Sequence, residues 1–313
     1  MSTPLITKYR PQTFADVIGQ DAIVRSLQST VKKRDSQIFL FGGPGGVGKT
    51  SIARIVARAL GVEDTQSAMI EIDAASKTGV DDMRQLQELL MYRPFGDSGR
   101  RALIIDECHR LSRQAWDSLL KALEEPPEHV IWCFCTTEPS KVPATIKTRC
   151  AKFDLQLVKD EDLGGLYDFV CEEEKINLPG DVGDLLIREA KGSPRQLLSN
   201  IVVARTARNK KEAAELLRTV NETDASLALC RFVADGGGSW AACMGLLSKL
   251  EDTNPESIRI MMANYLGKCL LSAKTDQAAV MYMTKLDGFA VPYVGTDGMA
   301  PLLVSIGRAL FAE

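Results

Sequence analysis

The 313-residue chain lacks the features that mark several protein classes. It has no apolar run close to the ~20 residues that span a bilayer. Its first residues, Met1-Ser2-Thr3-Pro4, do not form a secretory signal, so we expect a cytoplasmic protein. Two histidines and no CxxC pair argue against a zinc site. The net charge of −3 is small, so DNA would have to be bound by a local basic surface.

The cysteines that are present read as reduced, mostly buried thiols. Cys133 and Cys135 alternate along an expected strand, so both should face one side of a sheet and act as small apolar residues. The full set is Cys108, Cys133, Cys135, Cys150, Cys171, Cys230, Cys243 and Cys269. The remaining composition, 45% hydrophobic and 25% charged, is typical of a soluble protein of two or three domains.

A phosphate-binding loop is the most informative feature that the chain does contain. It is the stretch Gly43-Pro44-Gly45-Gly46-Val47-Gly48-Lys49-Thr50. Its glycines let backbone N–H groups turn toward a polyphosphate. Lys49 suits the β- and γ-phosphates, and the Thr50 hydroxyl suits Mg²⁺. An apolar run over 38–41 precedes the loop and a helical pattern follows it, which disfavours a chance glycine-rich turn and places the phosphates at a helix N-terminus.

A pair of carboxylates follows a second apolar strand, 102–105. Asp106 is the candidate for orienting hydrated magnesium, and Glu107 for polarising the attacking water. Both should lie at the carboxyl end of their strand, beside the glycine loop. Alone, an apolar run ending in Asp-Glu commonly marks only a strand that reaches the surface. Together with the loop it indicates an ATPase site.

Alternating strand and helix patterns predict a three-layer α/β domain with a mainly parallel sheet. The strand-like runs lie near 38–41, 69–72, 102–105, 130–135 and 152–155. One helix between them is expected to open at Thr78, and another carries Trp116, Leu119 and Leu123 on one face and stops at Pro126-Pro127.

Strand signals fade after about residue 156. Residues 159–207 predict three helices, with breaks at 178–180 and 192–194, where Ser193-Pro194 is a good helix start. A further helical region follows from about 224, interrupted at 235–239. It carries an apolar stripe that either forms an internal bundle core or packs on neighbouring subunits. The stripe consists of Ile258, Met261, Met262, Tyr265, Leu266 and Cys269.

Across nearly its whole length the chain resembles the clamp-loader ATPases of the AAA+ class, which include the bacterial tau/gamma subunits and the small subunits of replication factor C. The matching stretches are 8–20, 72–76, 120–127, 136–139 and 192–195. The resemblance implies an AAA+ P-loop ATPase domain over 1–156, a helical lid over 157–222 and a helical collar for oligomerisation over 223–313.

The resemblance also implies roles for individual residues. The N-terminal signature flanks the adenine pocket, and Ser51 extends the phosphate loop. The signature residues expected at the pocket are Tyr9, Arg10, Pro11, Val17 and Ile18.

Sensor and trans-acting residues follow from the same resemblance. Thr136 matches a first sensor of the γ-phosphate, although a slip of one residue would select Thr137, and Arg195 matches a second sensor in the lid. Arg149, within Thr148-Arg149-Cys150, matches a finger that enters the neighbouring subunit's site, for which a rigid, always-charged guanidinium is suited. We expect it at the sheet edge away from the glycine loop. Lys121 matches a second trans-acting position.

Phosphate contacts to DNA are expected at two helix starts, one formed by Ser76, Lys77 and Thr78 and the other by Arg110, Ser112 and Arg113. Ordinary helix capping and solvated charge is the alternative. The implied partners are a sliding clamp, primer–template DNA and other loader subunits, in a pentamer that includes at least one different chain.

The sequence therefore predicts an ATP-driven motor subunit that opens a sliding clamp and places it on primer–template DNA. The alternatives are a branch-migration AAA+ ATPase and an assembly subunit that binds ATP without hydrolysing it. Two departures from the bacterial pattern are a short 61–68 segment without the four-cysteine zinc module and an end at Glu313 without a long tail. They suggest a minimal phage-type or archaeal-type loader subunit, in the host cytoplasm if phage-encoded.

Overall fold

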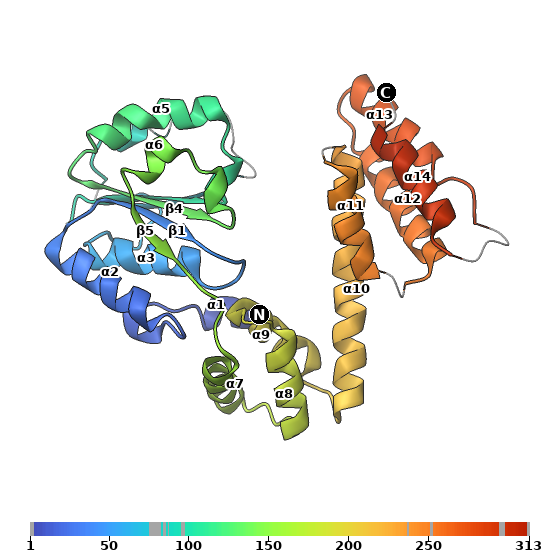
Figure 1. Cartoon of the computed structure of the whole chain (residues 1–313), viewed down its shortest axis with the longest axis horizontal. Coiled ribbons are helices and arrows are strands. Elements are labelled where there is room, and N and C mark those ends of the chain that lie inside the picture. The colour runs from blue at the N-terminus through green and yellow to red at the C-terminus, as the bar shows by residue number, and fades with distance from the viewer. Residues whose placement is uncertain are drawn as a thin grey trace. The chain divides into compact units, whose positions relative to one another are not determined.

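The computed structural model describes residues 3–74, 83, 86, 88–94, 98–236, 238–250, 253–293 and 298–311, without the side chains of 221–223. The chain divides into two compact units, Met1–Lys210 and Lys211–Glu313, drawn in Figure 1. Each unit is described by itself. None of the helices in these ranges combines the length and apolar character that a membrane crossing needs.

A parallel sheet of five strands organises the described part of unit 1. The strands are β1 (Ile38–Gly42), β2 (Met69–Asp73), β3 (Arg101–Asp106), β4 (Val130–Thr136) and β5 (Ala151–Asp154), in the order β2-β3-β4-β1-β5. All four pairings are parallel, and β1 and β4 are buried along their whole length. The predicted fold class and strand positions are confirmed, because strands covered on both faces read as continuous apolar runs.

Helices cover both faces of the sheet (Figure 1). The N-terminal and α/β part contains α1 (Leu5–Lys8), η1 (Phe14–Asp16), α2 (Asp21–Lys33), α3 (Lys49–Ala59), η2 (Cys108–Arg110), α5 (Arg113–Glu124), η3 (Pro139–Lys141) and α6 (Ala144–Lys147). One face of the sheet packs against α5, and the other against α2 and α3. The predicted start of a helix at Thr78 lies outside the described residues.

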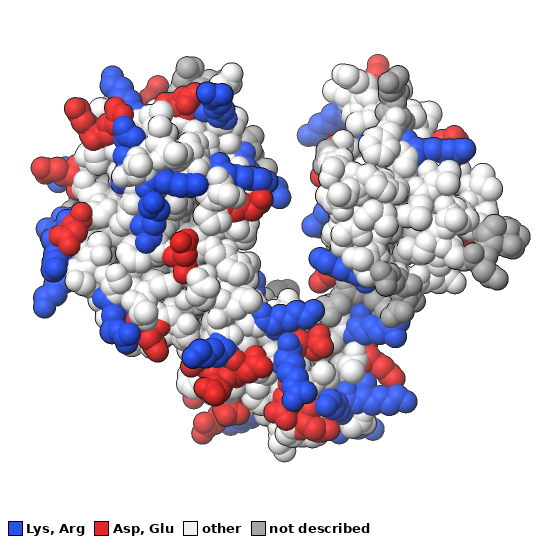
Figure 2. Space-filling view, in the orientation of Figure 1, with Lys and Arg blue, Asp and Glu red and all other residues white. Residues whose placement is uncertain are grey.

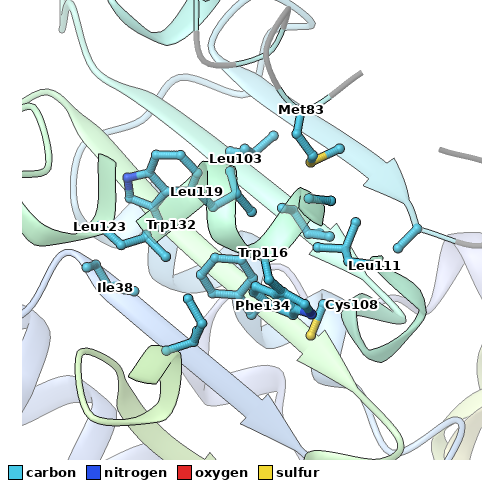
Figure 3. Close-up of a cluster of buried hydrophobic side chains, with 14 of the residues drawn as sticks. Ile38, Met83, Leu103, Cys108, Leu111, Trp116, Leu119, Leu123, Trp132 and Phe134 are labelled. Atoms are coloured by element: carbon cyan, nitrogen blue, oxygen red, sulfur yellow. The ribbon is translucent and has the colours of Figure 1, made fainter. Parts of the chain in front are cut away.

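Alternation along the strands divides the core of unit 1 into two clusters. Trp132 and Phe134 face α5, where they pack with its buried Trp116 and Leu119 (Figure 3). Cys133 and Cys135 face the opposite side with the α2 and α3 side chains. The prediction that these two cysteines share a face is therefore confirmed, and all eight cysteines are free thiols.

Three further helices complete unit 1: α7 (Asp160–Glu174), α8 (Gly180–Glu189) and α9 (Pro194–Ala204). Their breaks are those expected from the sequence. The Ser193 hydroxyl accepts the Gln196 backbone N–H at 3.2 Å, and Pro194 occupies the first helical position.

Unit 2 consists of helices in its described residues: α10 (Lys210–Asp235), α11 (Trp240–Leu247), η4 (Ser248–Leu250), α12 (Pro255–Leu271), α13 (Asp276–Asp287) and α14 (Ala300–Phe311). On α12, Ile258, Met262 and Leu266 are buried, and the rest of the predicted stripe packs partly buried against the same core. The stripe therefore belongs to an internal bundle core.

The helix α10 ends at a left-handed turn and a buried lysine. Gly236 has φ +67°, and the Nζ of Lys285 donates to the carbonyls of Val233 and Ala234, each at 2.9 Å. A cation that satisfies the last carbonyls of a helix also complements the helix dipole. The same α10 runs unbroken through residue 222, where the sequence placed a boundary; the three-part division at 156 and 222 stays a prediction.

Replacing Leu119 by alanine should destabilise unit 1 by about 2–5 kcal/mol, because it leaves a cavity in a fully buried cluster. Met91 is 72% exposed, so Met91→Ala should change stability by no more than about 0.5 kcal/mol. Urea unfolding followed by the fluorescence of Trp116 and Trp132, which lie in that cluster, measures both. Equal losses in the two variants would contradict the packing described.

Candidate nucleotide-binding site

A pocket in unit 1 lies where the glycine loop, the end of β3 and the start of α9 meet. It is lined by Ile6, Tyr9, Arg10, Pro11, Asp16, Val17, Ile18, residues 45–52, Asp106, Glu107, Leu166, Pro194, Arg195 and Leu198. The lining includes all five signature residues predicted to flank the adenine. Gly43 and Pro44 do not line the pocket, but their carbonyls accept hydrogen bonds from the Lys49 ammonium that does.

Strand register brings the loop and the carboxylates together. Gly42, the last residue of β1, pairs with Thr136, the last residue of β4, and Ile105 of β3 pairs with Phe134. The carboxyl ends of these three strands therefore lie at one edge of the sheet, which is where ligands bind in open α/β folds.

Two glycines of the loop are required by their surroundings. Gly46 has φ +75°, and a Cβ there would lie 2.2 Å from the Ser193 hydroxyl. Gly43 has φ +134°, and its Cβ would lie 2.4 Å from the Leu155 carbonyl oxygen. The loop thus passes too closely between the end of β5 and the start of α9 for any larger residue.

Lys49 is the buried cation of the pocket. Its side chain is 7% exposed, and its Nζ donates to the carbonyls of Gly43 at 2.9 Å and Pro44 at 2.7 Å. Burial lowers the pKa of Lys49, while the nearby Glu107 carboxylate opposes that shift. An ammonium held by neutral carbonyls in a desolvated pocket is suited to an anionic ligand.

Thr50 and Asp106 form the candidate magnesium site. The Thr50 hydroxyl donates to Asp106 Oδ2 at 2.8 Å, and the other carboxylate oxygen accepts the Glu107 backbone N–H at 3.0 Å. Hydroxyl and carboxylate oxygens are the ligands that Mg²⁺ prefers. These two residues would therefore fit as ligands of a magnesium ion.

Glu107 is held in an unusual conformation. Its φ is +47°, in the left-handed region that costs a non-glycine residue roughly 1–3 kcal/mol. Its Oε2 accepts from the Thr137 hydroxyl at 3.0 Å and the Thr137 backbone N–H at 3.3 Å, and it lies 3.3 Å from His109 Nδ1. The end of β4 and the turn after β3 therefore fix this carboxylate from two sides.

Thr136 and Thr137 face different partners. The fully buried Thr136 hydroxyl lies 3.0 Å from His109 Nδ1 and accepts the Glu138 backbone N–H at 2.9 Å. Thr137 instead contacts Glu107 directly. The assignment of Thr136 as the sensor stays a prediction, and the geometry gives Thr137 the direct contact with the candidate catalytic carboxylate. His109 was not predicted as a site residue, because a single histidine between a strand and a helix carries no motif of its own.

Arg195 lies in the first turn of α9, where the sequence predicts it, and lines the pocket. Its backbone N–H contacts the Gly46 carbonyl at 3.4 Å, so the helical part of unit 1 touches the glycine loop directly. Tyr9, which also lines the pocket, is held by its hydroxyl, which donates to Glu174 at 2.7 Å, and by its ring, which packs edge-on against Phe169. Leu166 and Leu198 were missed, since apolar helix positions read alike in a core and in a pocket lining.

Arg149 lies far from the pocket of its own chain. It precedes β5, whose Ala151 pairs with Phe39 near the start of β1, while the glycine loop follows the end of β1. The first and last residues of β1, four steps apart, are separated by about 13 Å. The prediction that Arg149 lies at the sheet edge away from the glycine loop is wrong. Its strand β5 is an edge strand but pairs with β1, so Arg149 and the glycine loop are separated along the strands and not across the sheet.

The guanidinium of Arg149 has partners in its own unit. It donates to the Thr145 carbonyl at 2.6 Å and to the Glu124 carboxylate at 2.5 Å. Lys121 is exposed on α5 three residues before Glu124, so the two predicted trans-acting cations share one region of the surface.

The predicted DNA contacts are partly described. Arg110, Ser112 and Arg113 are exposed at the N-terminus of α5, where the Ser112 hydroxyl caps the helix by accepting the Ala115 N–H at 3.1 Å. Ser76, Lys77 and Thr78 lie outside the described residues. On the face of unit 1 drawn in Figure 2, charges of both signs occur side by side, as the small net charge implies.

Comparison with known proteins identifies the family. A family model described as DNA polymerase III, delta subunit, matches residues 66–159. DNA polymerase III subunit tau of Escherichia coli is 36% identical over 258 residues, which are 75% of this chain and 40% of that protein. DNA polymerase III subunit gamma of Buchnera aphidicola is 31% identical over 288 residues, 84% of this chain and 78% of that protein. The chain belongs to the DNA polymerase III gamma/tau family.

Solved structures agree on the fold of this gamma/tau family member. The RuvB branch migration motor of Thermotoga maritima aligns with a TM-score of 0.57 at 18% identity, covering 77% of this chain and 85% of that one. At this identity the likeness shows the AAA+ fold alone.

Thr137→Val should lower the kcat of ATP hydrolysis by about 5- to 30-fold with little change in ATP affinity, because it removes a hydrogen bond to a charged group. Thr136→Val, which touches Glu107 only through His109, should lower kcat less and stability more, because its hydroxyl is fully buried. Steady-state turnover, nucleotide binding and thermal unfolding of both variants separate these effects. The reverse order in kcat would select Thr136 as the sensor.

Proposed function

We propose that this chain is an ATP-driven motor subunit of a sliding-clamp loader, which opens the clamp and places it on primer–template DNA during replication. The observation that carries the proposal is the convergence of Lys49, Thr50, Asp106 and Glu107 in one pocket of a gamma/tau family member. The chain spans only 40% of the length of the E. coli tau subunit, so activities of the rest of that subunit are not part of this proposal.

The pocket supports ATP hydrolysis as follows. The glycine loop and Lys49 bind the β- and γ-phosphates, and the signature residues such as Tyr9 and Val17 flank the adenine. Thr50 and Asp106 would hold Mg²⁺, which would supply positive charge to the transferring phosphoryl group. Glu107 polarises the attacking water, and Arg195 links the γ-phosphate to the lid.

The catalytic site is completed between subunits. Arg149 of one subunit reaches the γ-phosphate held by its neighbour, with Lys121 as a second possible contact from the same surface. The distance of Arg149 from its own pocket supports this arrangement. The proposed complex is a pentamer in the cytoplasm that includes at least one different chain.

Duplex DNA would be held through its phosphates. The N-terminus of α5 offers backbone N–H groups with Arg110 and Arg113 on either side of the Ser112 cap. Such contacts carry no base information, which suits a loader that acts at any sequence.

The two alternatives gain less support. A branch-migration motor shares the fold at 18% identity, whereas a tau subunit and a gamma subunit are 36% and 31% identical to this chain. A subunit that binds ATP without hydrolysing it has no need for the whole set of Lys49, Asp106, Glu107 and Arg149, and all four residues are present.

Two active-site variants test the shared site. Glu107→Gln should bind ATP but lose turnover, because the amide cannot polarise water. Arg149→Ala should bind ATP like the parent and lose most hydrolysis, since fingers of this type contribute roughly 10³–10⁵ in rate.

Mixing the two variants is the decisive measurement. An interface that pairs the intact Glu107 of the Arg149→Ala subunit with the intact Arg149 of the Glu107→Gln subunit regains a complete site. We expect partial recovery of ATP turnover in the co-assembled mixture. No recovery, with co-assembly shown by mass measurement, would count against a trans finger.

Changing Arg110 and Arg113 together to alanine should weaken DNA binding and reduce the slope of log affinity against log salt by about two units, one for each lost phosphate contact. Basal ATP turnover should be retained. The matched control is Lys33→Ala, an exposed lysine at the end of α2. If the double variant and the control show the same DNA affinity and the same salt dependence, the two arginines are only surface charges.

A further inference from the structure

The Arg149 guanidinium is held from two sides although both of its partners are near the surface. One terminal nitrogen donates to the Thr145 carbonyl of α6 at 2.6 Å, and the other to Oε1 of Glu124 at 2.5 Å. The side chain of Arg149 is 31% exposed and that of Glu124 is 54% exposed. The pair therefore links a residue of the β5 approach to the last residue of α5.

We propose that Glu124 is the positioning residue of the arginine finger: it holds the Arg149 guanidinium extended for the neighbouring subunit's γ-phosphate. This inference rests on the proposed function, because it assigns the orientation of the finger that the shared site requires. Glu124 touches neither nucleotide nor water in this role and acts only through Arg149.

The position of Glu124 is fixed by its own helix. Leu119 and Leu123 of α5 are buried in the core, and the helix ends at Glu124 directly before Glu125 and the rigid Pro126-Pro127. A carboxylate on the last residue of a well-packed helix has a defined place, whereas a free arginine side chain samples many rotamers. Such a fixed anchor is what a finger needs to arrive pre-oriented.

Donor counting shows that the held guanidinium stays competent for phosphate. Arginine carries five N–H donors, and the contacts to Thr145 and Glu124 use one on each terminal nitrogen. Nε and one N–H on each terminal nitrogen stay available for phosphate oxygens. The carboxylate also keeps the side chain from folding onto other acceptors of its own surface.

Stability is a poor explanation for the pair. Ion pairs between partly exposed side chains contribute little to folding and are weakened further by salt. Its effect should therefore appear in the orientation of Arg149, and hence in kcat. If the contact instead held Arg149 in an inactive position, removing Glu124 would raise turnover. The direction of the change in turnover therefore separates the two roles.

The test is ATP turnover of the assembled complex carrying Glu124→Ala. We expect kcat to fall about 3- to 10-fold at unchanged KM and unchanged ATP affinity, since only an interaction that acts in the transition state is lost. Glu125→Ala is the matched control: it is the next residue of the same motif, is exposed and has no ion pair among the described residues. It should leave turnover unchanged.

A double-mutant cycle of Glu124 and Arg149 distinguishes a positioning role of Glu124 from a purely structural one. In the Arg149→Ala background, Glu124→Ala should cause no further loss of kcat, because the residue through which it acts is gone. Independent, multiplicative losses would overturn the proposal, as would an increase in kcat for Glu124→Ala or an effect equal to that of Glu125→Ala. If Arg149→Ala alone leaves turnover unchanged, the trans finger itself fails, and Glu124 has nothing to position.

Discussion

The candidate site depends on the register of three parallel strands. Because Gly42 pairs with Thr136 and Ile105 with Phe134, the glycine loop, Asp106 and the two threonines at the end of β4 reach the same edge of the sheet. A slip of one residue would turn every side chain of a strand to the opposite face. It would move Asp106 away from the Thr50 hydroxyl and break the alternating core on both faces at once. The apolar pattern that buries the sheet is therefore also what aligns the site.

Local signals explain how much the sequence could predict. The strands, the helix breaks and the loop followed from short-range patterns, and the loop with its carboxylates was found because parallel strands end at one edge. The choice between Thr136 and Thr137 could not be made, because it depends on which way the chain turns after β4. The position of β5 beside β1 could not be predicted either, because the sequence pattern and length of a strand do not indicate which strand it pairs with.

Electrostatics and backbone strain meet at the same point. Lys49 is desolvated against carbonyls while Glu107 and Asp106 lie close enough to oppose the fall in its pKa. Glu107 is in turn held in a left-handed conformation by Thr137 and His109. Strain of this kind persists only where surrounding contacts over-determine it. A triphosphate with its magnesium would bring an anion to the buried Lys49 and a cation to the carboxylates at the same time.

A parallel sheet also limits what one subunit can do alone. The first and last residues of β1 are separated by about 13 Å, and Arg149 lies near the first while the glycine loop follows the last. No side-chain rotation closes that distance, because an arginine extends only about half as far. Under the proposed function the missing positive charge has to come from a second molecule, which presents the strand starts of one subunit to the strand ends of the next. This explains the contact of Arg149 with the end of α5. The contact orients a side chain that cannot serve its own pocket but has to reach the pocket of a neighbour.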